Sequence, residues 1–106
     1  MARELNQFDV CLIKAKGAGS NRLVVVLQHR VLSDLATVVV APLYRIEDLP
    51  AISQLRPVVR IGNQDYVMAV DRMASLPVAQ LGPSSKNLID MDYQIRKALD
   101  LVFSGF

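Results

Sequence analysis

Two nearly continuous apolar runs constrain this chain most, "RLVVVLQ" at residues 22–28 and "TVVVAPL" at residues 37–43. Both are rich in valine, whose branched side chain suits the extended backbone of a β-strand. Runs without regular polar alternation are typical of strands that are buried on both faces. The sequence therefore predicts a small closed or sandwiched sheet with these two segments in its core.

A further strand is expected near the start of the chain. The segment "QFDVCLIK", residues 7–14, has the alternation of a strand and is predicted to place Phe8, Val10 and Leu12 on one face. The loop "AKGAGSN", residues 15–21, contains two glycines and a Ser-Asn pair, which favour a flexible hairpin connection.

The middle of the chain carries a second group of β-type signals. Residues 44–55, "YRIEDLPAISQL", mix polar and apolar positions and contain a proline, which predicts an irregular excursion, with or without a short helical turn. Residues 56–70 then predict two strands joined at Gly62-Asn63, a compact hairpin signal. Residues 73–82 are expected to form one more short strand or a turn.

One helix is predicted at the end of the chain, over about residues 86–103. Ser84 or Ser85 is expected to cap its start after Gly82-Pro83. Apolar residues then recur at spacings of three or four, giving one stripe that consists of Leu88, Met91, Ile95, Leu99 and Val102. Strands followed by a terminal helix predict a mainly β fold, a barrel or a sandwich with the helix packed on it.

Size and composition favour one domain, residues 1–106, with its own core. The longest apolar run is Leu23 to Leu27, far below the roughly 20 residues that cross a bilayer. The start, "MARELNQF", lacks an apolar segment of signal-peptide length, so a cytoplasmic location is expected. The single cysteine, Cys11, is expected to be a small buried hydrophobic residue.

Few residues point to catalysis or to a charged partner. The net charge of +2 is small and its charged residues are dispersed, so nucleic acid is not the favoured partner. His29 is the only histidine, and with Cys11 it matches no metal-ligand spacing. One alternative stays open, in which Arg22, His29 and Arg30 cleave RNA by acid and base chemistry. Composition alone indicates a domain that binds a protein.

The ending "LDLVFSGF" is unusual because Phe106, an aromatic residue, closes a stretch that is otherwise a helix end. Chain ends are ordinarily polar and poorly ordered. This apolar ending therefore predicts a surface that packs on something, within this protein or on a partner.

Two stretches of the sequence resemble the CcdB family of toxins. They are "PVVRIGNQDYVMAVDRMASLPVAQLG", residues 57–82, and "QIRKALDLVFSGF", residues 94–106. The strings Pro-Val-Val-x-Ile-Gly and Met-Ala-Ser-x-Pro-Val and the Phe-x-Gly ending are together specific. The segments "QFDV", "RLVVVLQ" and "APL" follow the family's order, so the resemblance extends from residue 7 to the end, after a leader over residues 1–6.

The resemblance implies an SH3-like barrel of the CcdB, MazF and Kid type with a C-terminal helix, assembled as a homodimer. It also implies a type II toxin-antitoxin module, whose toxin binds the A subunit of DNA gyrase and traps the cleaved DNA complex. A CcdA-like antitoxin would neutralise the toxin, and DNA would be met only through the antitoxin complex, in transcription autoregulation. Such a toxin acts without catalysis, so no catalytic residue, metal or cofactor is expected.

The resemblance also assigns gyrase-contacting positions. Two consecutive branched aliphatic residues after the second strand correspond to Val31 and Leu32. The remaining positions lie at the end of the terminal helix and correspond to Asp100, Phe103, Ser104, Gly105 and Phe106.

Two of these positions depart from the family pattern. The family ends Phe-Trp-Gly-Ile, and Ser104 stands at the tryptophan position, while Asp100 replaces a neutral asparagine. The resemblance therefore leaves open a toxin of the same fold that no longer poisons gyrase or has another target, and a MazF-like endoribonuclease. Phe103 could instead belong to the core or a dimer interface, and Gly105 could serve only the chain end.

Overall fold

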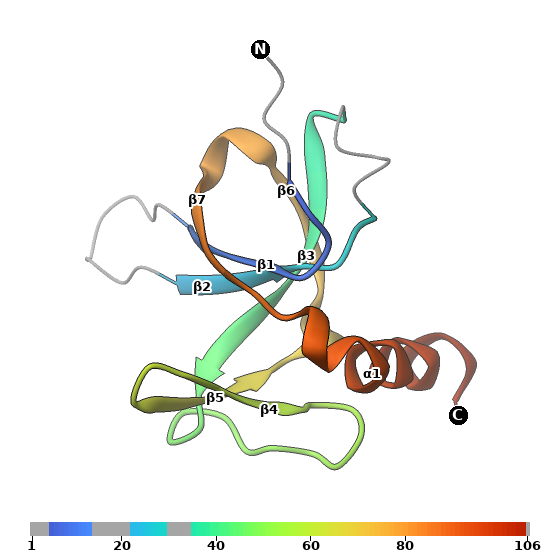
Figure 1. The fold of residues 1–106 in the computed structure, drawn as a ribbon. Helices are drawn as coiled ribbons and strands as arrows, with labels where there is room; N and C mark the ends of the chain where they lie inside the picture. The colour runs from blue at the N-terminus through green and yellow to red at the C-terminus, as the bar shows by residue number, and fades with distance from the viewer. Residues whose placement is uncertain (1–4, 14–21, 30–34, 106) are drawn as a thin grey trace.

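A computed structural model describes residues 5–13, 22–29 and 35–105 (Figure 1). The predicted loop at 15–21 lies outside these ranges. So do three of the expected functional residues, Val31, Leu32 and Phe106, as well as Arg30 of the ribonuclease hypothesis.

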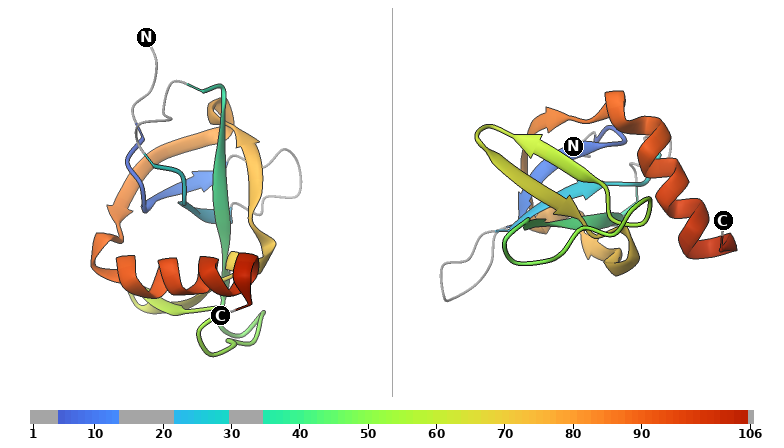
Figure 2. Two further views of the ribbon diagram at one scale, coloured as in Figure 1. Left: turned by 90° about the vertical axis from the view of Figure 1, so that its right-hand side faces the viewer. Right: turned by 90° about the horizontal axis from the view of Figure 1, so that it is seen from below.

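The fold is a curled antiparallel sheet with one α-helix after it (Figures 1 and 2). The strand order is β4-β5-β3-β2-β1-β7, and β6 pairs with β3 outside this path. The strands are β1 Asp9–Ile13, β2 Arg22–Val26, β3 Thr37–Arg45, β4 Val58–Ile61, β5 Gln64–Met68, β6 Ala74–Pro77 and β7 Leu81–Asn87. Short 3-10 turns lie between the later elements, at η2 Val70–Arg72, η3 Val78–Gln80 and η4 Ile89–Met91, and the helix is α1 Asp92–Ser104.

The two valine-rich runs form the centre of the sheet, as predicted. Val25 and Ala41 pair across β2 and β3 and pack into one apolar cluster, while Val24 and Val26 pack into a second. These two strands therefore bury both of their faces, which explains why their sequences show no regular polar alternation. Cys11 is fully buried in the second cluster, as expected.

The first strand keeps its predicted alternation of faces. Phe8 and Val10 are fully buried, but Leu12 is 37% exposed. The pairing of β1 with β7 shifts register between Val10 and Cys11 and again between Cys11 and Ile13. Leu12 nonetheless lies opposite Leu23 of β2, which packs against the same cluster as Phe8 and Val10, so the predicted shared face is confirmed and only the burial of Leu12 is incomplete.

The predicted hairpin at Gly62-Asn63 is confirmed. β4 and β5 pair with Ile61 opposite Gln64, so Gly62 and Asn63 form the turn between them. Gly62 has a φ of +62°, a backbone conformation that glycine adopts without steric cost. The segment 44–55 is irregular beyond the end of β3, as expected, and contains turns and an isolated bridge but no helix.

The helix begins later than predicted. Residues 81–87 form β7 beside β1, so neither Ser84 nor Ser85 caps a helix. The chain stays extended because the Leu88 N–H donates to the Phe8 carbonyl, 2.9 Å away, and the pairing with β1 satisfies the backbone. Asn87 Oδ1 accepts from the Ile89 N–H at 2.9 Å and starts the 3-10 turn that leads into α1. A start at 86 was therefore wrong by about two turns.

The helix packs on the sheet through part of its predicted stripe. Ile95 and Ala98 are fully buried, and Leu99 and Met91 pack against the same cluster. Val102 continues the stripe but is 38% exposed. No helix within the described ranges is long and apolar enough to span a bilayer.

The irregular segment is tied to the body of the protein by one ion pair. Arg56 donates from Nε and Nη2 to the two carboxylate oxygens of Asp71, at 3.0 and 2.9 Å. The two side chains are only 12% and 26% exposed, so water screens this bidentate pair less than a surface pair. The pair joins the end of the excursion to η2, which lies under α1.

This ion pair predicts an acid-sensitive stability. Hydrogen bonds from Arg56 lower the pKa of Asp71 below its ordinary value of 3.8. The folded protein therefore takes up a proton here less readily than the unfolded chain, and the pair stabilises the fold fully above pH 3.8. That stabilisation is lost as the pH falls through the lowered folded-state pKa.

We expect the free energy of unfolding, measured with urea at a series of acidic pH values, to fall as the pH is lowered. The fall is expected to be less steep in Asp71→Asn than in the wild type. Asp65→Asn is the matched control, because its pair with Arg60 is exposed. Equal pH dependence in Asp71→Asn and the wild type would contradict this assignment.

Candidate functional site at the end of the terminal helix

The last turn of α1 presents three of the predicted site residues on one exposed surface. Asp100 precedes Phe103 by three positions and Ser104 by four, spacings that make side chains neighbours on a helix. All three are exposed, and Phe103 is 74% exposed. The turn lies at the outer edge of the molecule, where α1 extends away from the sheet (Figures 1 and 2). Placement of Phe103 in the chain's own core was therefore wrong.

Gly105 completes this turn. Its φ of +79° is left-handed, and its N–H donates to the Leu101 carbonyl at 3.0 Å. This is the usual glycine ending of a helix, which satisfies a carbonyl that would otherwise lack a partner. The glycine therefore supports a helical backbone at Phe103 and Ser104. Gly105 has this capping role in addition to the one expected for it at the chain end.

A polar network fixes where α1 starts. The Asn87 amide Nδ2 donates to the Gln7 carbonyl and to Asp9 Oδ1, each at 2.9 Å. The other oxygen of Asp9 accepts from the Asn6 N–H at 3.0 Å, so this buried carboxylate is satisfied on both oxygens. Asn87 thus joins the start of β1 to the start of the helical segment.

A second contact holds the first turns of α1. Arg96 Nε donates to Asp92 Oδ1 at 2.6 Å, and Arg96 Nη2 donates to Gln7 Oε1 at 3.3 Å. These contacts lie far along the helix from Phe103 and orient it from its anchored end. Sequence reasoning missed Asn87 and Asp9, although an asparagine before a helical segment is itself a capping signal.

The outer side of α1 carries a second exposed aromatic residue at its other end. Tyr93 is 73% exposed and lies beside a hollow of about 230 Å³ between the helix and the irregular segment. The side chains of Gln54, Pro57, Gln94 and Lys97 line the rest of this hollow. Tyr93 is as exposed as Phe103, and it provides a matched control for the site.

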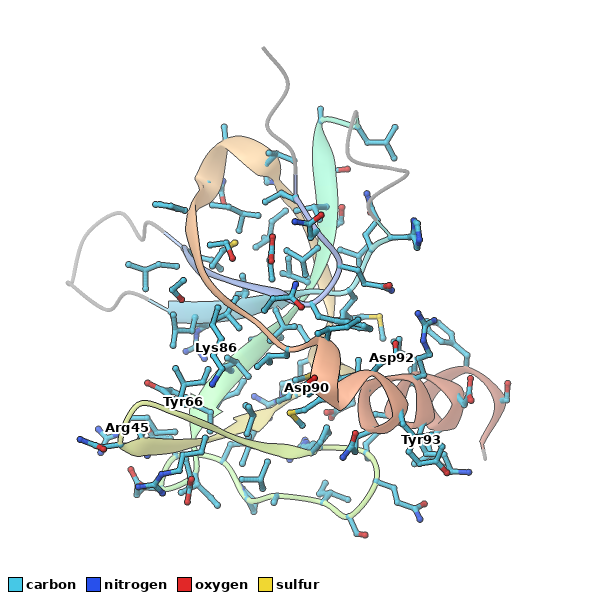
Figure 3. The ribbon with its side chains drawn as sticks, viewed as in Figure 1. Arg45, Tyr66, Lys86, Asp90, Asp92 and Tyr93 are labelled. Carbon is cyan, nitrogen blue, oxygen red and sulfur yellow. The ribbon has the colours of Figure 1, made fainter. Side chains whose placement is uncertain are left out.

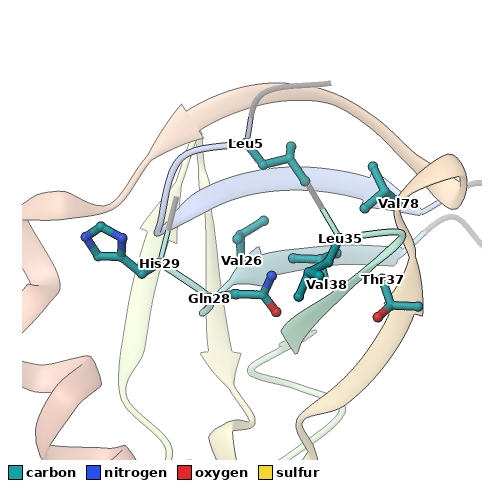
Figure 4. Close-up of a pocket in the computed structure, with 8 residues that line it drawn as sticks. All are labelled: Leu5, Val26, Gln28, His29, Leu35, Thr37, Val38 and Val78. Carbon is teal, nitrogen blue, oxygen red and sulfur yellow. The ribbon is translucent and has the colours of Figure 1, made fainter. Parts of the chain in front are cut away.

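The two described residues of the ribonuclease hypothesis, Arg22 and His29, are not brought together. Arg22 begins β2, whereas His29 follows its far end, and a strand rises by about 3.3 Å per residue. His29 borders a cavity of about 10 Å³, enough for about one water molecule. Its imidazole points away from the other lining side chains, Gln28 and Thr37 among them (Figure 4). Arg22 and His29 therefore cannot act together on one phosphate within this chain.

Solved structures share this fold. The Mycobacterium tuberculosis toxin MazF-mt6 superposes with a TM-score of 0.71 at 21% identity, covering 90% of this chain and 95% of that one. A mycobacterial endoribonuclease solved with its cognate antitoxin gives a TM-score of 0.67 at 15% identity, over 93% and 92% of the two chains. A further toxin, from Mtb, gives 0.67 at 23% identity, over 92% and 99%. These likenesses confirm the predicted barrel of the CcdB and MazF type.

The sequence identifies the family of this chain, which the shared fold alone does not. Residues 7–105 match the family described as CcdB protein, which is nearly the whole chain. The matched range contains both the sheet and the exposed last turn of α1. The chain therefore belongs to the CcdB family, the toxins of toxin-antitoxin modules.

Proposed function

We propose that this protein is the toxin of a type II module that binds the A subunit of DNA gyrase and traps the gyrase-DNA cleavage complex. The observation that carries the proposal is the last turn of α1, which exposes 74% of Phe103 on a helix completed by Gly105. An aromatic ring presented on an ordered backbone loses little conformational freedom on binding, which favours affinity. Asp100 and Ser104 flank the ring, and Val31, Leu32 and Phe106 complete the proposed contact set.

The proposed toxin acts by binding and not by catalysis. Trapping a cleaved complex requires a surface that fits one state of gyrase better than the others, because a ligand shifts an equilibrium only by its differential affinity. Arg22 begins β2, whereas His29, a second residue of the ribonuclease hypothesis, lies beyond the far end of the strand. This separation supports the binding mode over the endoribonuclease alternative.

The protein is proposed to act as a homodimer. Val102 continues the inward-facing stripe of α1, yet it is 38% exposed because the helix extends past its own sheet. An apolar side chain on such an overhang gains free energy when a second copy covers it, at about 25 cal/mol per Å² buried. A two-fold dimer would also present two helix ends to the two A subunits of gyrase.

A CcdA-like antitoxin is the proposed neutralising partner. One protein of the same fold was solved in complex with its cognate antitoxin, which supports an equivalent partner here. An antitoxin that covers the end of α1 would compete directly with gyrase. For transcription autoregulation, contact with DNA is proposed only through the antitoxin complex.

The departure at Ser104 gives a prediction of its own. Ser104 is exposed beside Phe103, where the family pattern has tryptophan. Ser104→Trp is expected to tighten binding to the gyrase A subunit by at least about tenfold, because tryptophan adds apolar burial and a cation-π contribution of about 1 kcal/mol. Isothermal titration calorimetry with the purified gyrase A subunit measures this change.

The same titration tests the alternative of a toxin that no longer poisons gyrase. Wild-type protein that binds, with Ser104→Trp binding more tightly, supports the proposed function. Binding that is detected only in Ser104→Trp would instead favour the alternative. Failure of both proteins to bind would reject gyrase as the target.

A further inference from the structure

An open cleft lies at the end of the sheet away from α1, and the proposed gyrase contact does not use it. Its volume is about 530 Å³, within the range of sites for small ligands and cofactors. Arg45 and Tyr66 mark its position in Figure 3, opposite the end of the molecule where Tyr93 lies. The lining residues are Arg22, Leu23, Leu43, Tyr44, Arg45, Asp48 and Tyr66.

The ring of Tyr44 is contacted by Arg22, which lines the cleft, and by Arg72, which lies outside the lining. The Arg22 guanidinium lies 4.2 Å from the centroid of Tyr44, and that of Arg72 lies 5.3 Å from it. Arg72 Nη1 also donates to the Tyr44 hydroxyl at 3.4 Å. Among the described residues, neither arginine forms an ion pair. Their guanidinium groups are therefore placed against an aromatic ring.

The lining also contains a second tyrosine and a second arginine. Arg45 and Tyr66 are register partners across β3 and β5, so their side chains are neighbours on one face. Arg45 is held by Glu47 at 2.8 Å in an exposed pair, which screening weakens. Asp48 also lines the cleft and supplies an acceptor.

We propose that this cleft binds a nucleoside phosphate, either free or as a unit of a single-stranded nucleic acid. The Tyr66 ring offers a flat surface on which a base stacks, and Arg22 and Arg45 offer fork-shaped donors for a phosphate. Asp48 accepts a hydrogen bond from a sugar hydroxyl or a base amino group. An acidic peptide would use the arginines but would leave the Tyr66 ring without a stacking partner and meet the Asp48 carboxylate. The arginines are dispersed in the sequence, so only the fold gathers them.

Fluorescence anisotropy with a labelled single strand of about six nucleotides, as RNA and as DNA, tests the site. Arg22→Gln is expected to weaken binding about 5- to 100-fold and to reduce the slope of log affinity against log salt by about 0.7. Tyr66→Leu, which keeps an apolar side chain, is expected to weaken binding within the same range. Arg60→Gln is the matched control, because Arg60 is an exposed arginine of β4 that does not line the cleft. Circular dichroism checks that each variant is folded.

Competition separates the two sources of the ligand. Displacement of the strand by an unlabelled nucleoside monophosphate shows that the free nucleotide suffices, whereas resistance to it assigns the site to the polymer. The proposal is overturned if neither ligand binds, if Arg60→Gln and Arg22→Gln weaken binding equally, or if only a polyglutamate peptide binds. Gyrase binding is a separate readout that depends on Phe103, so either proposal can fail alone.

Discussion

Phe103→Ala is expected to weaken binding to the gyrase A subunit by about 30- to 1000-fold. Truncating an aromatic residue at the centre of an interface typically costs about 2 to 4 kcal/mol, and about 1.4 kcal/mol corresponds to a factor of ten. Phe103 is 74% exposed in the free protein, so its loss removes contact area for a partner and little internal packing. Titration of the gyrase A subunit with both proteins measures the change.

The helix provides its own control for this experiment. Tyr93 is 73% exposed on the same helix but lies at the anchored end, away from the proposed contact. Tyr93→Ala is expected to bind gyrase like the wild type and to be about as stable, since exposed substitutions usually change stability by less than about 0.5 kcal/mol. Equal losses of affinity in Tyr93→Ala and Phe103→Ala would show that the last turn has no special role.

Phe8→Ala is expected to lower the free energy of unfolding by about 3 to 5 kcal/mol. Phe8 is fully buried where the start of β1, the end of β2 and the segment before α1 meet. Its N–H donates to the Val26 carbonyl at 2.7 Å, and its own carbonyl accepts from the Leu88 N–H. The ring therefore fills the junction that these backbone bonds create, and alanine would leave a cavity there.

The backbone of Phe8 makes this position unusual. Its φ of +72° is left-handed, a conformation that costs a bulky residue about 1 to 2 kcal/mol. The packing of the ring must exceed this cost, and alanine keeps the cost while losing the packing. Chemical denaturation measures the effect, with Phe103→Ala as the control for the same truncation at an exposed site. A loss below about 1 kcal/mol in Phe8→Ala would contradict this account of the core.

The strands were predictable because their physical signals are local. The valine-rich character of β2 and β3 reflects burial on both faces, and the Gly62-Asn63 turn reflects a backbone conformation that glycine tolerates. The start of the helix was not predictable in the same way. Residues 81–87 form a strand because β1, some 70 positions earlier, offers backbone partners, and no local pattern records that pairing.

The candidate site was also predictable only where the signal is local. The grouping of Asp100, Phe103 and Ser104 follows from helical spacing, so it could be expected once a helix was predicted. The exposure of Phe103 could not be predicted, because it depends on where the sheet ends beneath α1. The meeting of Arg22, Tyr44 and Arg72 likewise depends on strands and turns far apart in the sequence.

The proposed function is the poisoning of gyrase by binding to the cleaved complex. A DNA cleavage assay with purified gyrase, supercoiled plasmid and ATP tests it most directly, with Phe103→Ala beside the wild type. The account predicts that wild-type protein causes linear DNA to accumulate after detergent and protease treatment, and that Phe103→Ala leaves far less. No linear DNA above the level of gyrase alone, from wild-type protein that is folded and in excess, would contradict the account.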